Sequence, residues 1–201
     1  PVLDPLTMPL GVILALIAYG VYSCGDAVIK GFGSSLSVFE IGFFTALFSL
    51  LPAIVAKPKG EHWRHTWKMR HPWLLQMRAL AGLCATLLVI YGFTTTPLAE
   101  VYSIVFLTPV FITIISVVVM KEQVSLQRWV LLATTFVGVM LVVRPGFREL
   151  HLGHLAAVGA AFFASINTTV LRAISTCETK VSLIGVVVSY AVVADGILMI
   201  P

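Results

Sequence analysis

The chain has 201 residues, of which 59% are hydrophobic and 11% are charged, and its formal net charge is +4. Soluble domains carry roughly 25% charged residues, so this composition excludes a water-soluble globular domain and is typical of a membrane protein. The basic residues lie in loops between apolar stretches, where they indicate membrane orientation rather than nucleic-acid binding. None of the three cysteines belongs to a C-x-x-C pair, so we expect neither a metal site nor a cofactor.

The first apolar span, from about Leu10 to Lys30, carries its polar residues along one side. No basic region precedes it and many apolar spans follow, so we interpret it as a membrane helix rather than a signal peptide. Helical spacing collects five polar side chains on a single stripe, namely Tyr19, Tyr22, Ser23, Asp26 and Lys30. We expect this stripe to face the bundle interior or a wet cavity, because a carboxylate turned to lipid costs about 3 kcal/mol.

Asp26 is the residue of this stripe that most strongly indicates a function. An ionisable carboxylate within a membrane span serves either as a proton carrier or as the counter-charge for a cationic group. The alternative is an intrahelical pair with Lys30, four residues on, which would hold the outer end of the helix shut. We therefore predict substrate binding or coupling for Asp26, Tyr19 and Tyr22, and gating or ion pairing for Lys30.

The second span, from about Leu36 to Ala56, leads into the most basic loop of the chain, residues 57–70. The positive-inside rule places this loop in the cytoplasm. Counting spans from it puts about ten basic residues inside and three outside, with the N-terminus in the cytoplasm. We expect a multi-pass membrane protein in this orientation.

The third span, from about Trp73 to Thr94, carries Arg78 roughly one turn inside its cytoplasmic end. A long basic side chain at that depth can snorkel to the headgroups. The other interpretation is an internal ion pair or a gate, and the sequence leaves both open. Further along, Gly82, Ala85 and Gly92 lie on one side, where small residues allow close helix packing.

Two further spans, Leu98 to Met120 and Leu126 to Val143, form a hairpin around a short charged turn. At about 1.5 Å per residue the first is about 34 Å long as a helix, enough to cross a hydrocarbon core of about 30 Å. Pro109 lies within it and has no N–H to bond the carbonyl of Val105, so we expect an interruption there. Such a break requires protein groups or water to take up the freed carbonyl, so this helix should face protein or a cavity.

One face of the fourth span is partly aromatic. Helical spacing brings Tyr102 and Phe106 to the same face as Pro109 and turns Glu100 away from it. Aromatic residues in such a stripe either pack against neighbouring helices or contact a ligand. We include Tyr102 and Phe106 among the candidate substrate-binding residues.

The hairpin carries an ordered set of short motifs over about fifty residues. They are Pro97-Leu98-Ala99-Glu100, Thr108-Pro109-Val110-Phe111, Lys121-Glu122-Gln123-Val124, Arg128-Trp129, Gly138-Val139 and Arg144-Pro145-Gly146. With this set the chain resembles the drug/metabolite transporter superfamily, EamA type. The resemblance implies ten helices in two five-helix repeats, and transport of small solutes across the bacterial inner membrane. Thr45 stands where the family pattern usually has an arginine after an aromatic pair, which weakens the case for an anionic substrate.

His151 and His154 follow the fifth span. Their spacing could serve a metal ion, but two ligands do not make a site. We expect both to be exposed loop residues, and we predict no metal ligands.

The sixth span repeats the first. A shift of 142 positions matches Gly11 with Gly153, Ala15 with Ala157, Ala18 with Ala160, Ser23 with Ser165, Val28 with Val170, and Lys30 with Arg172. Five spans separate the copies, and an odd number per repeat inserts the second copy in the opposite orientation, as in many secondary transporters. Two rows of small residues in this span suit tight packing. Its polar residues Ser165 and Asn167 join the candidate substrate-binding residues.

These observations predict an all-α, polytopic membrane helix bundle of inverted five-helix repeats, with the second repeat truncated. Residues 1–146 would form the first EamA-type repeat, and residues 147–201 would start the second with two helices. The seventh span, from about Val181 to Pro201, contains Asp195. We expect either a fragment of a ten-helix protein or a divergent short form.

The expected function is a secondary transporter, which moves a small metabolite across the bacterial inner membrane by alternating access, with proton coupling as an option. Its partners would be a small-molecule solute and the lipid bilayer, with a homodimer as a further option and no nucleic acid. The alternatives are an intramembrane enzyme and a channel-like or structural membrane protein. Because the motifs H-E-x-x-H, G-x-S-G and G-x-G-D are absent, we predict no enzyme and no catalytic residues.

Overall fold

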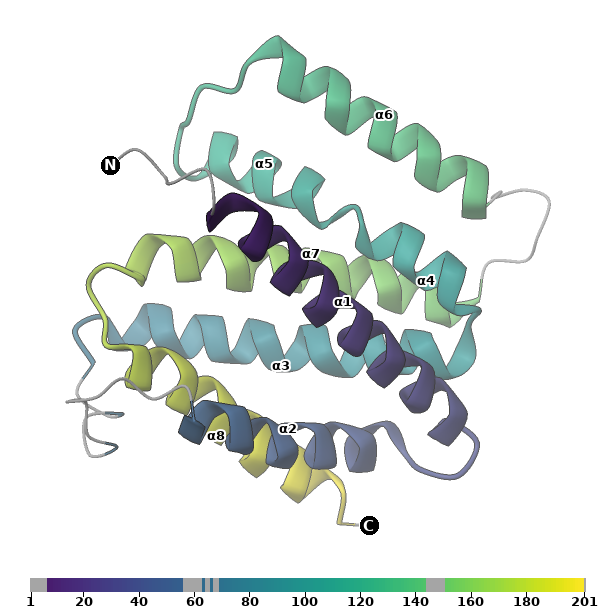
Figure 1. Ribbon diagram of the computed structural model, residues 1–201, viewed down its shortest axis with the longest axis vertical. Coiled ribbons are helices and arrows are strands. Elements are labelled where there is room, and N and C mark those ends of the chain that lie inside the picture. Colours follow the sequence, from purple (N-terminus) through teal and green to yellow (C-terminus); the bar gives the residue numbers. More distant parts are fainter. Residues whose placement is uncertain (1–6, 56–62, 64–65, 67–68, 144–150, 201) are drawn as a thin grey trace.

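The computed structural model describes residues 7–55, 63, 66, 69–143 and 151–200, and Figure 1 shows its arrangement. Its helices are α1 (Thr7–Phe32), α2 (Val38–Val55), α3 (Pro72–Thr95), α4 (Leu98–Val105), α5 (Thr108–Val118), α6 (Leu126–Val143), α7 (Leu152–Ile174) and α8 (Lys180–Leu198). No strand occurs within these ranges, so the predicted all-α class is confirmed. The motif Arg144-Pro145-Gly146 and most of the basic loop 57–70 lie outside the described residues.

Among the described segments, six are long and apolar enough to cross a membrane, with α4 and α5 together making one of them. The shorter helix α6 is also apolar. These segments correspond to the seven predicted spans. The boundaries that we predicted lie within about three residues of the observed ones. They agree because a long apolar run largely sets the length of a membrane helix. The chain therefore forms a multi-pass membrane helix bundle.

The predicted interruption of the fourth span is confirmed, because α4 ends at Val105 and α5 begins at Thr108. Pro109 lies in the first turn of α5, where a proline costs no hydrogen bond. The Thr108 hydroxyl donates a 2.6 Å hydrogen bond to the carbonyl of Val105. The Thr108 hydroxyl thus donates to the carbonyl that Pro109 leaves without an N–H partner. Such side-chain hydrogen bonds are one way in which a broken helix is tolerated in an apolar environment.

The helices α3 and α7 pack side by side at the centre of the bundle (Figure 1). The small residues of α7 face this contact, and Ala157 and Ala161 are fully buried. At Gly153 the approach is closest, since a Cβ there would lie 2.0 Å from the hydroxyl oxygen of Thr96 and 2.5 Å from that of Thr95. The prediction that rows of small residues allow tight packing is confirmed.

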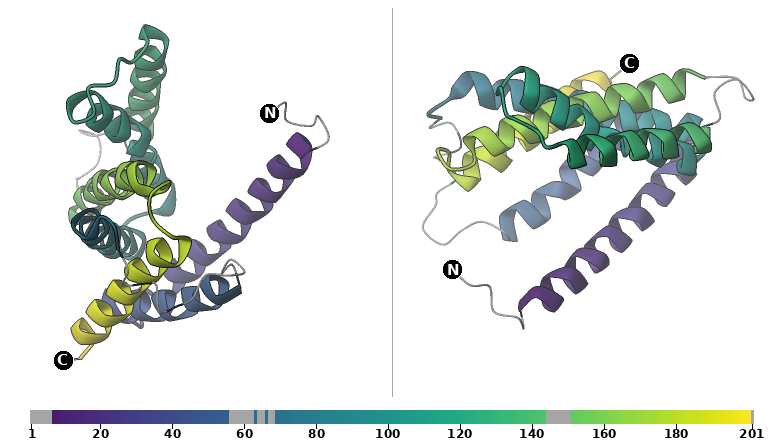
Figure 2. Two further views of the ribbon diagram at one scale, coloured as in Figure 1. Left: turned by 90° about the vertical axis from the view of Figure 1, so that its left-hand side faces the viewer. Right: turned by 90° about the horizontal axis from the view of Figure 1, so that it is seen from above.

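The helix α1 crosses the bundle obliquely, and its N-terminal end stands apart from the other helices (Figure 2). Its side chains are exposed from Leu10 to Gly25, and the first buried one is that of Asp26. Two hydrogen bonds are among the contacts that hold its C-terminal part: Asp26 accepts one from Tyr102, and Lys30 donates one to the backbone carbonyl of Thr96. The polar stripe is therefore anchored where α3 meets α4.

The first and last helix pairs share one register. A shift of 142 positions carries Phe32 and Val38, which flank the turn after α1, onto Ile174 and Lys180, where α7 ends and α8 begins. The apolar parts of α1 and α7 are both 23 residues long. The pairs α1–α2 and α7–α8 therefore match in the length of their connecting turn and in the apolar length of their first helix.

Candidate functional site

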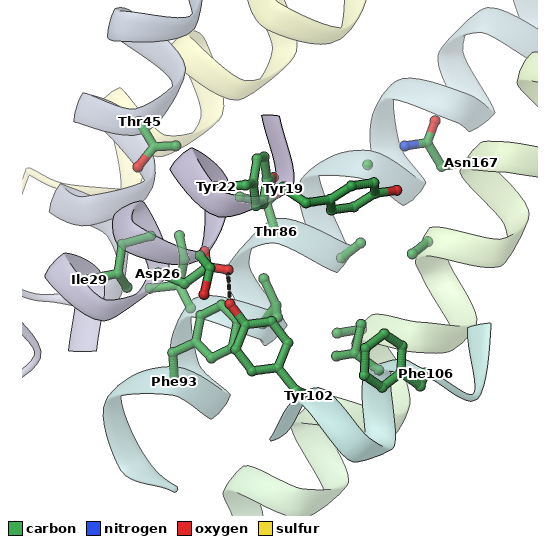
Figure 3. Close-up of a pocket in the computed structure, with 18 residues that line it drawn as sticks. Tyr19, Tyr22, Asp26, Ile29, Thr45, Thr86, Phe93, Tyr102, Phe106 and Asn167 are labelled. Atoms are coloured by element: carbon green, nitrogen blue, oxygen red, sulfur yellow. Dashed lines mark hydrogen bonds between the residues drawn. The ribbon is translucent and has the colours of Figure 1, made fainter. Parts of the chain in front are cut away.

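A cavity of about 540 Å³ lies between α1, α3, α4 and α7, with Thr45 of α2 at its edge. This size and a mostly apolar wall with a few polar groups are usual for sites that bind small molecules. Figure 3 shows how the side chains converge on it. Its aromatic and polar lining residues are Tyr19, Tyr22, Ser23, Asp26, Thr45, Thr86, Phe93, Tyr102, Phe106 and Asn167.

The polar stripe of α1 supplies one wall of this cavity. Four of its five predicted members, all except Lys30, line the space. Asp26 is only 6% exposed, and its Oδ2 accepts a 2.5 Å hydrogen bond from the Tyr102 hydroxyl. Tyr19 and Tyr22 are 77% and 73% exposed, so they form the open rim above the buried carboxylate.

Lys30 does not pair with the carboxylate four residues before it. Its Nζ donates a 2.9 Å hydrogen bond to the backbone carbonyl of Thr96, which follows α3. Asp26 instead bonds the hydroxyl of Tyr102. Among the described residues that line the cavity, Asp26 alone carries a formal charge.

The broken helix supplies the opposite wall. Tyr102 lies on α4, and Phe106 lies directly after it at the interruption, so the break brings this ring to the cavity (Figure 3). The Tyr102 ring also packs on Phe93 of α3, with ring centroids 5.4 Å apart. The aromatic face predicted for the fourth span therefore packs against α3 and lines the cavity, and its contact with a ligand stays a prediction.

The helix α7 contributes the amide of Asn167 to the lining, beside Ala160 and Ala164. A Cβ at Gly82 of α3 would lie 3.3 Å from Asn167 Nδ2, so this glycine makes room for the amide. Ser165 lies outside the lining, since it is fully buried and its hydroxyl donates to the carbonyl of Phe162. Of the two predicted polar residues of the sixth span, the structure thus brings only Asn167 to the cavity.

Arg78 also lies away from the cavity. Its guanidinium donates to the backbone carbonyl of Leu183 on α8, and its Nε has no partner among the described residues. This side chain therefore joins no ion pair in the part of the chain that the structure describes. It ties α3 to the first turn of α8.

Glu100 and His154 form a buried contact that sequence reasoning missed. The expectation of an exposed loop histidine is wrong for His154, which lies in the first turn of α7, is 7% exposed and places Nε2 2.8 Å from Glu100 Oε2. It is correct for His151, which is exposed. In the sequence, the residue that could have indicated this contact is Glu100, because a carboxylate that lies within a membrane span and points away from its aromatic face requires a partner.

The sequence profile of the EamA-like transporter family matches residues 9–144, which cover most of the chain and include the stripe, the broken helix and the hairpin. The chain belongs to the EamA-like transporter family. In the described part of this EamA-like chain, no three His, Cys, Asp or Glu side chains are grouped to hold a metal ion.

Relatives of this EamA-like chain are named as solute carriers or transporters, and two of them are named for different solutes. Solute carrier family 35 member G1 of Homo sapiens is 29% identical over 185 residues, which are 81% of this chain and 48% of the relative. An S-adenosylmethionine uptake transporter of Rickettsia prowazekii is 28% identical over 165 residues, or 78% of this chain and 54% of the relative. A riboflavin transporter of Vibrio cholerae is 28% identical over 88 residues, which are 44% of this chain and 30% of the relative.

This EamA-like chain spans about half the length of the first two of these relatives. No solved structure matches it.

Proposed function

We propose that this chain carries the solute site of a secondary transporter, which moves a small metabolite across the bacterial inner membrane by alternating access. The observation that supports it is the cavity beside Asp26, which is lined by helices from both ends of the sequence. Alternating access requires a site that lies between two units able to move against each other. Here α1, α3 and α4 of the proposed first repeat line the cavity together with α7 of the proposed second repeat.

The proposal includes the division of the chain into two repeats, residues 1–146 and 147–201. The common register of α1–α2 and α7–α8 supports it, because helix ends coincide after the same shift that aligns the sequences. With five spans between the copies, the second repeat would lie in the membrane in the opposite orientation to the first. Such a pair can exchange conformations and so open the site to either side.

We further propose that the N-terminus and the loop 57–70 face the cytoplasm, which the placement of basic residues supports. The test uses a protein without its native cysteines, in which single cysteines replace Gly60 in this loop or Ser34 in the turn between α1 and α2. An impermeant thiol reagent added to intact cells should label position 34 and not position 60. Labelling of position 60 and not of position 34 would show that the orientation is opposite to the proposed one.

Transport is tested with the intact gene product in liposomes. S-adenosylmethionine and riboflavin, for which two relatives are named, are the first probes. A carrier accumulates labelled solute against unlabelled solute inside, a channel only equilibrates it, and an enzyme converts it. We expect saturable exchange of at least one metabolite that is lost in Asp26→Asn and kept in Glu122→Gln, a carboxylate variant outside the cavity. Exchange that Asp26→Asn leaves unchanged would place the solute site elsewhere.

A further inference from the structure

The described side chains that line the cavity carry charge of one sign only, which is negative. Among its described lining residues Asp26 is the only charged side chain. The basic residues nearest to it on its own helix and on α3 are occupied elsewhere, since Lys30 bonds the carbonyl of Thr96 and Arg78 that of Leu183. The carboxylate therefore has a hydroxyl donor, Tyr102, but no cationic partner from this part of the protein.

Aromatic rings line the cavity beside this carboxylate and across from it. Tyr22 and Tyr19 lie on its own helix, Phe93 comes from α3, and Tyr102 and Phe106 come from the broken helix (Figure 3). The face of an aromatic ring attracts a cation within about 6 Å of its centroid, and the attraction increases where water is excluded. A carboxylate beside several rings is the combination that holds an ammonium or sulfonium group, whereas an anion would meet both the carboxylate and the negative ring faces.

The remaining wall suits an uncharged body. Residues such as Ile29, Ala85 and Val89 make most of it apolar, and the amide of Asn167 provides a polar group away from Asp26 (Figure 3). A ligand with a cationic group at one end and a flat or apolar part with an amide or hydroxyl at the other would match these features. An apolar pocket with a few placed polar groups fixes the orientation of such a ligand.

We infer that the solute of this site is an organic cation, bound by its ammonium or sulfonium group at Asp26 between the rings of Tyr22, Tyr102 and Phe106. This inference rests on the proposed function, because it assigns a substrate class to the proposed solute site. The uncharged Thr45 at the cavity edge agrees with it, since this position adds no cation to attract an anionic solute.

The test compares three ligands of nearly the same shape and different charge. They are the 1-methylnicotinamide cation, its neutral isostere 3-methylbenzamide and the anion 3-carbamoylbenzoate. Binding to the detergent-purified intact protein is measured by equilibrium dialysis. We expect the cation to bind at least ten-fold more tightly than the neutral isostere, and the anion to bind most weakly.

Variants then assign the preference to individual side chains. Asp26→Asn should reduce the cation preference to less than two-fold while the neutral ligand still binds, and Asp26→Glu should restore most of it. Phe106→Leu should weaken the cation about three- to ten-fold more than the neutral ligand. The matched control Phe111→Leu removes a ring that packs on Phe162 and does not line the cavity, so it should leave the preference unchanged.

Three results would overturn the inference: equal binding of cation and neutral isostere, preference for the anion, or no binding of the cation at millimolar concentration. The liposome exchange assay distinguishes these results from failure of the proposed function. A protein that exchanges a solute but shows no cation preference refutes the substrate class alone. A protein that neither binds nor exchanges any of the probes refutes both.

Discussion

Glu100 of α4 and His154 of α7 form a buried pair, with 2.8 Å between Oε2 and Nε2. The other ring nitrogen of His154, Nδ1, accepts a hydrogen bond from the backbone N–H of His151. Because Nδ1 acts as an acceptor, Nε2 carries the proton and donates a hydrogen bond to the carboxylate. The pair thus fixes the start of α7 to α4, the helix that carries Tyr102, and so links two helices that line the cavity.

We expect His154→Ala to destabilise the protein, because it leaves the Glu100 carboxylate without this donor in a buried position. The loss should be about 1.5–3 kcal/mol, the range for a hydrogen bond to a charged group. Thermal unfolding in detergent measures it. Leu155→Ala, at the next position of the same helix and 69% exposed, is the matched control and should change the midpoint little. Equal effects of the two variants would show that the pair contributes no stability.

Gly153 sets the distance between α7 and the end of α3. Gly153→Ala would place a Cβ 2.0 Å from the Thr96 hydroxyl oxygen and 2.5 Å from that of Thr95, so these side chains or the helices must shift. We expect a loss of about 1–3 kcal/mol, as for other overpacked sites. Gly138→Ala on α6 is the control, because a Cβ there meets nothing within 4 Å. That substitution should stabilise its helix by roughly 0.5–1 kcal/mol, since glycine is a poor helix former. A neutral Gly153→Ala would contradict the close contact.

The sequence was informative wherever a local pattern determines structure. The lengths of apolar runs located the spans, the ring of Pro109 located the break, and helical spacing placed Tyr19, Tyr22 and Asp26 on one wall of the cavity. The rows of small residues in α7 indicated a packing face before its partner was known. These features depend on residues within a few turns of one another.

Contacts between distant segments could not be predicted in the same way. Glu100 and His154 are 54 positions apart, and the choice of partner depends on how α4 and α7 dock. For Lys30, helical spacing allowed a pair with Asp26 four residues away, but the ammonium group bonds the Thr96 carbonyl at a separation of 66. Ser165 has polar chemistry similar to that of Asn167, yet its side chain turns back to its own helix. Tertiary packing decided each of these cases.

Glu178 caps a helix from which it is distant in sequence. It lies after α7, is 8% exposed, and its Oε1 accepts hydrogen bonds from the backbone N–H groups of Arg70 and His71, at 2.8 and 2.6 Å. These groups immediately precede α3, where a carboxylate also interacts favourably with the helix dipole. Glu178→Ala should therefore loosen the start of α3.

Hydrogen exchange measures this effect directly. In Glu178→Ala the amides of Arg70, His71 and the first turn of α3 should exchange about ten-fold faster or more, because a lost buried hydrogen bond costs roughly 1–3 kcal/mol. Glu122→Ala is the control, since its carboxylate forms a partly exposed pair with Arg172 at 3.4 Å. Unchanged exchange at Arg70 and His71 would refute the capping role.

Asp195 is a buried carboxylate with no hydrogen-bond partner for either oxygen among the described residues. It lies on α8 and is 1% exposed, and a Cβ at Gly42 of α2 would come within 2.8 Å of its Oδ2. Burying an unpaired polar group is unfavourable, and an ionised carboxylate costs more than a neutral amide.

Asp195→Asn keeps the shape and removes the charge, so it should raise the unfolding midpoint, with a gain on the order of 1 kcal/mol. Asp195→Glu is the opposite control, because its extra methylene presses against Gly42 and should destabilise the α2–α8 contact by about 1–3 kcal/mol. Thermal unfolding of the three proteins in one detergent gives the order Asn, then Asp, then Glu. A lower midpoint for Asp195→Asn than for the unaltered protein would show that the carboxylate is stabilised in place, and that the cost of its burial is offset at this position.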